Sequence, residues 1–117
     1  MNIDIIAGTR PNFIKIASII KAINKSKNKI NYRLIHTGQH YDKNMSDSFF
    51  KQLSIPKPDI MLNAGSGTYA EQTAKIMINY EKVLKKFHSD YCLVVGDVTS
   101  SMACSIIAKN FGMKVFH

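Results

Sequence analysis

In Ile3-Asp4-Ile5-Ile6-Ala7-Gly8-Thr9-Arg10-Pro11-Asn12, a short apolar strand runs directly into a glycine turn, and a helix begins at that turn. Pro11 suits a first helical turn, where its missing N–H has no partner in any case. The helix shows apolar residues at helical spacing, namely Phe13, Ile16, Ala17, Ile20 and Ile23. The junction gathers a hydroxyl, a guanidinium and free helix N–H groups at one strand end. It therefore predicts an anion site, with phosphate as the expected anion.

The alternation of strand and helix patterns continues along the chain. Further strands are expected over residues 32–36, 60–62, 91–95 and 113–116, and further helices over about 45–53, 68–87 and 100–111. Thr68 and Glu71 form a capping-box pattern at the start of the second of these helices. The near-continuous apolar run over 91–95 is typical of a strand that is covered on both faces. The order predicts an α/β fold with a doubly wound, Rossmann-like parallel sheet.

Three polar segments leave the ends of predicted strands, at residues 8–12, 37–42 and 96–101. Ligands of such sheets bind beyond the carboxyl ends of the strands, near the point where the strand order reverses. We therefore expect these segments to lie together at one edge of the sheet.

Composition limits the classes of function. The chain has 117 residues, 45% of them apolar, and a net charge of +8. Only two basic residues are arginines and the lysines are spread over several segments, so we expect no nucleic-acid partner. No stretch is long enough to cross a membrane, and the first apolar run is short and interrupted by Asp4. The two cysteines lack metal-ligand spacing and are expected to be buried and reduced, in a cytoplasmic protein without metal or other cofactor.

Three residues are candidates for phosphate binding or proton transfer. The Arg10 fork suits phosphate oxygens, although a surface arginine also pairs with carboxylates. Lys15 adds a point charge, or is simply solvated. Asp97 follows an apolar run and a glycine, where desolvation raises the pKa of a carboxyl; it is a general acid/base candidate or a helix N-cap.

Other polar positions carry weaker signals. His40 is a candidate for nucleotide-sugar contact or proton transfer, or it stabilises its loop. The loop 65–67 is a phosphate cradle or a flexible connection, and it lacks the lysine of a P-loop. Ser100 and Ser101 have no histidine partner at recognisable spacing. His36 is expected to be structural.

Four segments occur together and in order: Gly8-Thr9-Arg10-Pro11 with Lys15, residues 37–42, Ala70-Glu71-Gln72-Thr73, and Val95-Gly96-Asp97-Val98. In this combination the chain resembles the N-terminal domain of non-hydrolysing bacterial UDP-N-acetylglucosamine 2-epimerases, from Met1 to His117. The resemblance implies one half of a two-domain, glycosyltransferase-B-like architecture with its active site in the cleft. It also implies interconversion of UDP-N-acetylglucosamine and UDP-N-acetylmannosamine for polysaccharide synthesis, by elimination of UDP and its re-addition.

The resemblance assigns roles to individual residues. Arg10 and Lys15 are expected beside the diphosphate and sugar, and Asp97 as a general acid/base. Gln39 and His40 match positions that contact a second, regulatory nucleotide sugar in some members. Asn12 replaces a glutamate that is common there.

Other departures bear on regulation and on activity. The loop 65–67 lacks an arginine–glutamine pair used by regulated members, so regulation is not expected. Family members continue past the histidine matching His117 into a catalytic glutamate and a second domain. We therefore expect the chain to be inactive alone, with the nucleotide sugar, a complementing C-terminal polypeptide and a second copy in a homodimer as partners. Alternatives are a nucleotide-sugar binding module without catalysis, a glycosyltransferase-related domain and a non-functional relic.

Overall fold

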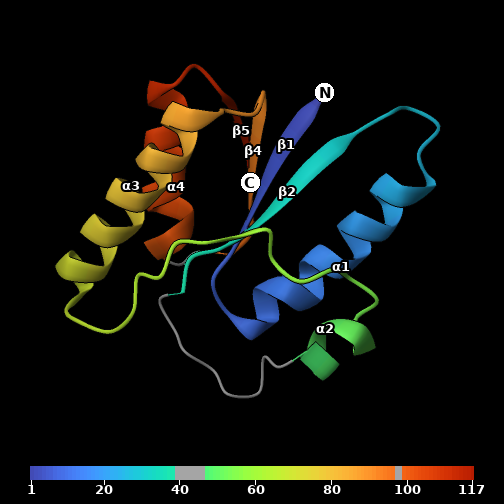
Figure 1. Ribbon diagram of the computed structural model, residues 1–117, viewed down its shortest axis with the longest axis horizontal. Helices are drawn as coiled ribbons and strands as arrows, with labels where there is room; N and C mark the ends of the chain where they lie inside the picture. The colour runs from blue at the N-terminus through green and yellow to red at the C-terminus, as the bar shows by residue number, and fades with distance from the viewer. Residues whose placement is uncertain (39–46, 97–98) are drawn as a thin grey trace.

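The computed structural model describes residues 1–38, 47–96 and 99–117, which form a parallel sheet flanked by helices (Figure 1). The strand order is β3-β2-β1-β4-β5, so the chain moves outward from β1 on one side and then returns to build the other. The elements are β1 (Asn2–Ala7), α1 (Arg10–Lys25), β2 (Asn31–His36), α2 (Asp47–Gln52), β3 (Ile60–Met61), α3 (Tyr69–Lys86), β4 (Tyr91–Val94), α4 (Thr99–Asn110) and β5 (Lys114–Phe116). The predicted doubly wound, parallel α/β fold is confirmed.

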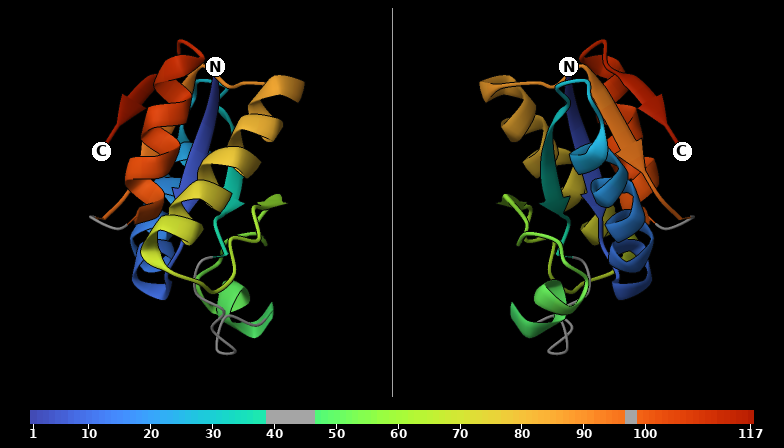
Figure 2. Two further views of the ribbon diagram at one scale, coloured as in Figure 1. Left: turned by 90° about the vertical axis from the view of Figure 1, so that its left-hand side faces the viewer. Right: turned by 90° about the vertical axis from the view of Figure 1, so that its right-hand side faces the viewer.

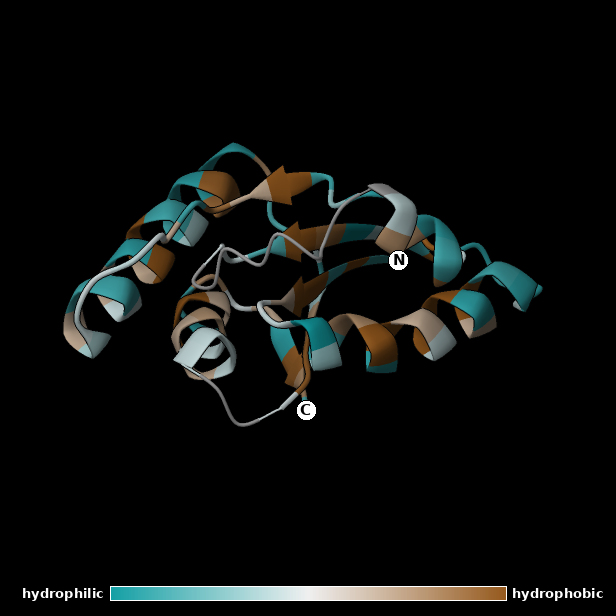
Figure 3. Cartoon of the chain, turned by 90° about the horizontal axis from the view of Figure 1, so that it is seen from below, coloured by the Kyte–Doolittle hydropathy of each residue, from teal (hydrophilic) through white to brown (hydrophobic). Residues whose placement is uncertain are grey.

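Helices cover the two faces of the sheet unequally. Helix α1 lies on one face, and α3 and α4 lie side by side on the other (Figure 2). The first core places Phe13, Ile16 and Ile20 of α1 against strand residues that include Ile5 and Leu34. The second core places buried residues of α3 and α4 against the opposite face of the strands. Figure 3 shows the corresponding hydrophobic segments along the strands, between the two helix layers.

The expectation that β4 is covered on both faces is confirmed for one face and holds only in part for the other. Cys92 and Val94 are buried under α3 and α4, whereas Tyr91 is partly buried and Leu93 and Val95 are partly buried against the core on the α1 side. Helix α1 connects β1 to β2, so it lies over that half of the sheet and leaves the same face of β4 less covered. An apolar sequence run therefore overstated the coverage of this strand.

The acidic residue that interrupts the first apolar run has a structural role. Asp4 is fully buried. Its carboxylate accepts hydrogen bonds from Nε and Nη2 of Arg33, at 2.7 and 2.8 Å, and from the hydroxyls of Tyr80 and Ser89, at 2.8 and 2.6 Å. Burial, followed by the nearby Cys92 and Asp4, raises the pKa of Tyr80 far above its usual value, so its hydroxyl remains a donor. The amino half of the sheet thus holds a buried carboxylate that is well supplied with donors.

Local signals at the ends of the helices are also confirmed. The backbone N–H of Thr68 donates to Oε1 of Glu71, and the N–H of Glu71 donates to the Thr68 hydroxyl, both at 3.1 Å, as a capping box requires. The bonds to Thr68 lower the pKa of Glu71. Gly112 follows α4 with a φ of +77°, the left-handed conformation that glycine adopts after a helix.

The cysteines are buried free thiols, as the sequence predicts. Burial raises the pKa of Cys92 to about 12, so its sulfur is a neutral thiol at physiological pH. None of the helices in the described part of the chain combines the length and the apolar character that a bilayer crossing requires.

Candidate functional site

The described parts of the three polar segments meet at the edge where the strands have their carboxyl ends, here called the carboxyl edge (Figure 1). The backbone N–H of Thr37 donates to the carbonyl of Ala7 at 2.9 Å, which joins the ends of β1 and β2. The side-chain nitrogen of Asn12 lies 3.0 Å from the position that a Cβ on Gly96 would take, which joins the ends of β1 and β4. The predicted shared edge is therefore confirmed for these residues.

Arg10 is the first residue of α1 and is exposed. Its guanidinium carbon lies 5.0 Å from the centre of the Phe49 ring of α2. A guanidinium stacked on an aromatic face is oriented by the ring and still presents its N–H edge to other groups. The stacking thus fixes the cation at the carboxyl edge and leaves it able to bind an anion.

The helix N–H groups at this junction are less available than the sequence indicates. The side-chain oxygen of Asn12 accepts hydrogen bonds from the N–H groups of Gly8 and Thr9, at 3.1 and 3.2 Å. The N–H groups of Asn12 and Phe13 donate to the carbonyl of Thr9, and Pro11 has no N–H. The set of free N–H groups is therefore smaller than expected, because the Asn12 side chain already accepts those of Gly8 and Thr9, just before the helix. Anion binding here depends mainly on the Arg10 side chain.

Lys15 is exposed on α1 but does not point in the same direction as Arg10. Lys15 is five positions after Arg10, and a helix turns by about 100° per residue, so their side chains leave the axis about 140° apart. The helix thus separates the two cations around its axis. A ligand that touches both must extend around the first turns of α1, or the flexible lysine must reach around the helix.

Three predicted site residues, namely Asp97, Gln39 and His40, lie outside the described residues. Their neighbours are described. Gly38 has a φ of +73°, and a Cβ on it would lie 3.1 Å from the backbone of Asn63, so only glycine fits there. Gly96, which precedes Asp97, has a φ of +83°. Both loops that carry these candidates therefore leave the sheet through a glycine in the left-handed region.

His36 has the structural role that the sequence predicts. It is buried at the end of β2, and its ring centre lies 5.1 Å from that of Phe13. Its Nδ1 accepts the N–H of Gly38 at 2.8 Å. Burial lowers the pKa of His36, so the ring is neutral at physiological pH and its proton is on Nε2. The ring thus supports the turn through Gly38.

The glycine loop before α3 is attached to its surroundings. The N–H of Gly65 donates to the carbonyl of Gly38 at 2.9 Å, and the amide of Gln72 donates to the carbonyl of Gly65 at 2.8 Å. The Lys75 ammonium donates to the carbonyl of Ser66 at 3.4 Å. One N–H that a phosphate cradle needs is thus already bonded. The Ser101 hydroxyl is also used, since it donates to the carbonyl of Val95 at 3.0 Å.

The sequence interpretation missed the contribution of Asn12, which it noted only as a departure from a family pattern. Asn12 is 5% exposed and lies at the third position of α1, after the N-cap residue Thr9. A short amide at that position is the detectable signal, because it reaches back to N–H groups before the helix. In residues 1–38, 47–96 and 99–117, no three His, Cys, Asp or Glu side chains gather as a metal site.

Comparisons with known proteins show which family this chain is similar to. The family model described as UDP-N-acetylglucosamine 2-epimerase matches residues 21–117. A UDP-N-acetylglucosamine 2-epimerase of Methanocaldococcus jannaschii is 44% identical over 117 residues, which is 100% of this chain and 31% of that protein. A UDP-2,3-diacetamido-2,3-dideoxy-D-glucuronate 2-epimerase of Pseudomonas aeruginosa is 38% identical and is covered to 33%.

Among solved structures, the Methanocaldococcus jannaschii UDP-GlcNAc 2-epimerase in complex with UDP-GlcNAc and UDP matches with a TM-score of 0.91 and 44% identity. The match covers 100% of this chain and 32% of that chain. The chain thus spans about a third of the length of the relatives that it matches.

Proposed function

Because this chain belongs to the UDP-N-acetylglucosamine 2-epimerase family, we propose that residues 1–117 supply the N-terminal, Rossmann-like wall of a site that epimerises C2 of a UDP-linked N-acetylated sugar. The observation that carries the proposal is the 44% identity to a named epimerase over the whole chain. The stacked, exposed Arg10 and the glycine turn before Asp97 support it, because both lie at the edge where such sheets bind ligands.

The chemistry of the proposal follows from the substrate. The C2 hydrogen of the sugar has no adjacent carbonyl, so direct deprotonation is difficult. A base removes the C2 proton as the C1–O bond breaks and UDP leaves with the bonding electrons, which gives a glycal. A proton then adds to the other face of C2, and UDP returns to C1. The reaction needs carboxyl groups near C2 and cations beside the leaving diphosphate.

In this proposal the chain's own residues divide those tasks. Arg10 and Lys15 stabilise the negative charge that develops on the diphosphate, and Asp97 transfers a proton at the sugar. Gln39 and His40 are assigned to contact with a second nucleotide sugar. The loop 65–67 lacks an arginine–glutamine pair, so we expect that contact to have no regulatory effect.

We further propose that the chain is inactive alone and that a complementing C-terminal polypeptide completes the site. The chain covers 31% of the Methanocaldococcus jannaschii relative, and a transition state is stabilised only when all of its charged partners are placed together. Its substrate is then UDP-N-acetylglucosamine. The Pseudomonas aeruginosa relative makes a UDP-2,3-diacetamido sugar acid the second candidate.

Deuterium incorporation at C2 in heavy water tests both parts. We expect none with the 117-residue chain alone, and incorporation after addition of the remaining two thirds of the Methanocaldococcus jannaschii relative. Incorporation by the chain alone contradicts the need for a partner. A third outcome favours a binding module without catalysis. In that case calorimetry detects binding of UDP-N-acetylglucosamine, but neither nucleotide sugar incorporates deuterium even when the partner is present. Asp97→Asn is the inactive control.

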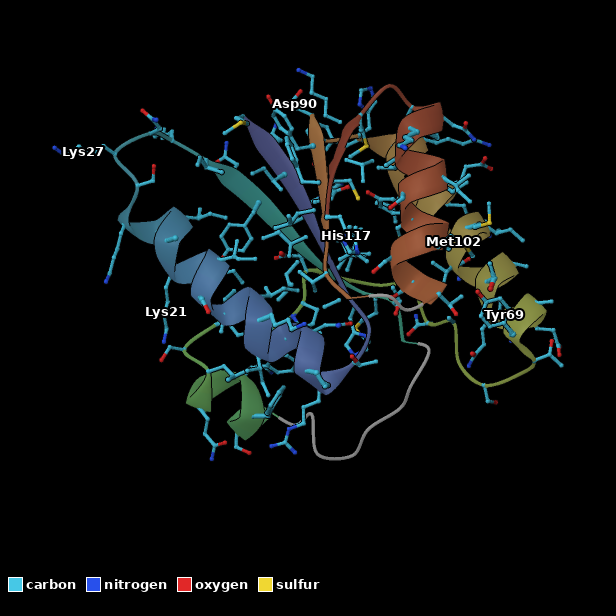
Figure 4. All side chains as sticks on the ribbon, turned by 180° about the vertical axis from the view of Figure 1, so that it is seen from behind. Lys21, Lys27, Tyr69, Asp90, Met102 and His117 are labelled. Carbon is cyan, nitrogen blue, oxygen red and sulfur yellow. The ribbon has the colours of Figure 1, made fainter. Side chains whose placement is uncertain are left out.

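We also propose a homodimer through the outer face of α3 and α4. Three large apolar side chains are 44–54% exposed there, namely Ile78, Met102 and Ile106. One of them, Met102, is labelled on α4 in Figure 4. Ile106→Lys is expected to convert dimer to monomer in sedimentation, whereas Ile14→Lys, at an exposed site on α1, is not. A wild-type monomer at all concentrations contradicts this assembly.

We place the protein in the cytoplasm. The support is chemical: both cysteines are free, and buried thiols of this kind are typical of a reducing compartment. Cell fractionation tests this assignment.

A further inference from the structure

Exposed lysines that are far apart in the sequence gather at the edge of the sheet where the strands begin, here called the amino edge. Backbone hydrogen bonds join the strand starts. The N–H of Asn31 donates to the carbonyl of Met1 at 2.9 Å, and that of Lys114 donates to the carbonyl of Asp90 at 3.1 Å. Helices α1, α3 and α4 end toward this edge, where Figure 1 marks the N-terminus. Eight exposed lysines lie in their last two turns or just beyond, namely Lys25, Lys27, Lys29, Lys82, Lys85, Lys86, Lys109 and Lys114.

Carboxylates do not balance this charge. The segments that form the amino edge are residues 24–31, 81–91 and 107–115, and their acidic residues are Glu81 and Asp90. Oε1 of Glu81 lies 3.7 Å from Nζ of Lys85. Most of the lysines therefore remain in excess, and a surface with such an excess of positive charge attracts anionic partners.

Favourable interaction with the helix ends explains only part of this pattern. A lysine in the last turn of a helix stabilises the partial negative charge of the helix C-terminus. The lysines in last turns are Lys25, Lys85, Lys86 and Lys109. Lys27 and Lys29 lie beyond α1, however, and Lys114 is the first residue of β5. Helix ends therefore do not account for the charge of these three.

Two large apolar side chains are exposed at the same edge. Met1 and Phe87 are each 52% exposed. The carbonyl of Phe87 accepts a hydrogen bond from Nη2 of Arg33 at 3.2 Å, and its ring centre lies 5.2 Å from the guanidinium carbon. Arg33 is also paired with Asp4, so the cations that the amino edge offers to a partner are lysines. Exposed apolar side chains among lysines are typical of surfaces that bind the interfacial layer of a bilayer.

We propose that the amino edge docks on an anionic lipid bilayer. Lysine suits such a surface, because its ammonium is a point charge on a flexible stem and needs no fixed partner geometry. Nucleic-acid and protein interfaces favour the planar fork of arginine instead. Each lysine close to an anionic membrane surface raises the affinity by about fivefold. The proposal does not depend on the proposed function.

Docking through the amino edge leaves the candidate site accessible. The parallel strands run from the amino edge to the carboxyl edge, so Arg10, which is exposed at the carboxyl edge, faces away from the bilayer. Figure 4 shows Lys27 and Asp90 toward one end of the molecule and Tyr69, at the start of α3, away from them. A soluble ligand thus reaches the carboxyl edge while the protein is bound to a membrane.

Vesicle binding by the 117-residue chain tests the proposal. The probes are vesicles of phosphatidylcholine alone and vesicles in which about one third of the lipid is phosphatidylserine. We expect binding to the anionic vesicles and none to the neutral ones. Salt screens these charges, so the affinity is expected to fall by about tenfold or more between about 0.1 M and 0.5 M salt. Equal binding to both kinds of vesicle, or binding to neither, overturns the proposal.

A pair of double variants separates the amino edge from net charge. Lys27→Gln with Lys29→Gln is expected to lower the affinity for anionic vesicles by about 20-fold or more. The matched control is Lys51→Gln with Lys75→Gln, which removes the same charge from exposed positions of α2 and of the first half of α3. We expect the control to stay within about twofold of wild type, because distant charges are screened. Urea unfolding verifies that each variant is folded, and equal losses in the two double variants overturn the proposal.

A second pair of variants separates a bilayer from nucleic acid. Phe87→Ala removes an apolar side chain from the amino edge and is expected to weaken binding to anionic vesicles by about tenfold. Phe116→Ala is the matched control, since Phe116 is 51% exposed at the end of β5, and it is expected to bind like wild type. A DNA duplex is the competing probe. Binding to the duplex in preference to anionic vesicles, unchanged by Phe87→Ala, assigns the amino edge to nucleic acid and overturns the proposal.

Discussion

The two halves of the sheet use charged side chains in opposite ways. In the amino half, the Asp4 carboxylate is fully buried and accepts four hydrogen bonds, two of them from Arg33. At the carboxyl edge, Arg10 and Lys15 are exposed, and the buried side chain that organises the turns there is the neutral Asn12. The charge of Asp4 in the amino half is thus paired within the protein, whereas the charges of Arg10 and Lys15 at the carboxyl edge remain available to a ligand.

Residues that stabilise the fold and residues that can bind a ligand therefore lie at opposite ends of the segment formed by β1 and the start of α1. Asp4 and Arg10 are six residues apart in sequence, yet only Asp4 has its partners within the core. We therefore expect substitutions of the buried charge in the amino half to unfold the protein. Substitutions of exposed charges at the carboxyl edge are expected to change ligand chemistry and to leave the fold intact.

The largest expected effect on stability follows Asp4→Ala. The variant leaves the Arg33 guanidinium and the hydroxyls of Tyr80 and Ser89 without their acceptor. Loss of one partner of a buried pair costs about 3–5 kcal/mol, and we expect the lower end because Arg33 is 22% exposed. Urea unfolding measures the change. The control is Glu81→Ala, which removes an exposed pair with Lys85 and is expected to cost under about 0.5 kcal/mol. A cost below about 1 kcal/mol for Asp4→Ala would show that the network is not stabilising.

Gly96→Ala is the next largest change and tests the packing of the carboxyl edge. The φ of +83° costs an alanine about 1–2 kcal/mol, and its Cβ also lies 3.0 Å from the Asn12 amide. Gly112→Ala is the matched control, since its φ is +77° and a Cβ there meets nothing within 4 Å. We expect Gly96→Ala to lose more unfolding free energy than Gly112→Ala. Equal losses would mean that Asn12 yields freely and does not fix the turn.

The smallest effect is a pH dependence at His36. Because burial lowers its pKa in the folded state, the unfolded chain binds the proton more tightly. The contribution of His36 to the free energy of unfolding is therefore fully present above the ordinary histidine pKa of about 6.5. As the pH falls below that value, this contribution decreases by at most about 1.4 kcal/mol per pH unit. Protonation also opposes the bond from the Gly38 N–H to Nδ1. Urea unfolding of wild type and His36→Gln at pH 7.5 and 5.5 measures this loss. If both proteins lose the same unfolding free energy between the two pH values, His36 is not its source.

The parts of the fold that the sequence predicts well are those that depend on local patterns. The junction from β1 to α1, the capping box at Thr68 and the order of strands and helices all follow from residues close together in the chain. The partners of Asp4 do not, because Arg33, Tyr80 and Ser89 are 29, 76 and 85 residues away. Only tertiary packing brings them together, so the sequence shows Asp4 merely as an interruption.

The candidate site is predicted less completely for a different reason. Its residue types and their shared edge follow from the topology of a parallel sheet. The capture of the Gly8 and Thr9 N–H groups depends on a single side-chain oxygen, and the separation of Arg10 and Lys15 depends on their angular positions around α1. The partial exposure of β4 depends on which half of the sheet α1 covers, and an apolar run carries no information about that.

The separation of the two halves of the sheet is tested most directly by Arg10→Gln. Deuterium incorporation at C2 of UDP-N-acetylglucosamine is measured in the assembly with the complementing polypeptide, together with the urea unfolding of the 117-residue chain. We expect incorporation to fall by about 100-fold or more, since a cation beside the leaving diphosphate is removed, while the unfolding free energy stays within about 0.5 kcal/mol of wild type. Wild-type incorporation by Arg10→Gln, or unfolding of the variant, would contradict the account.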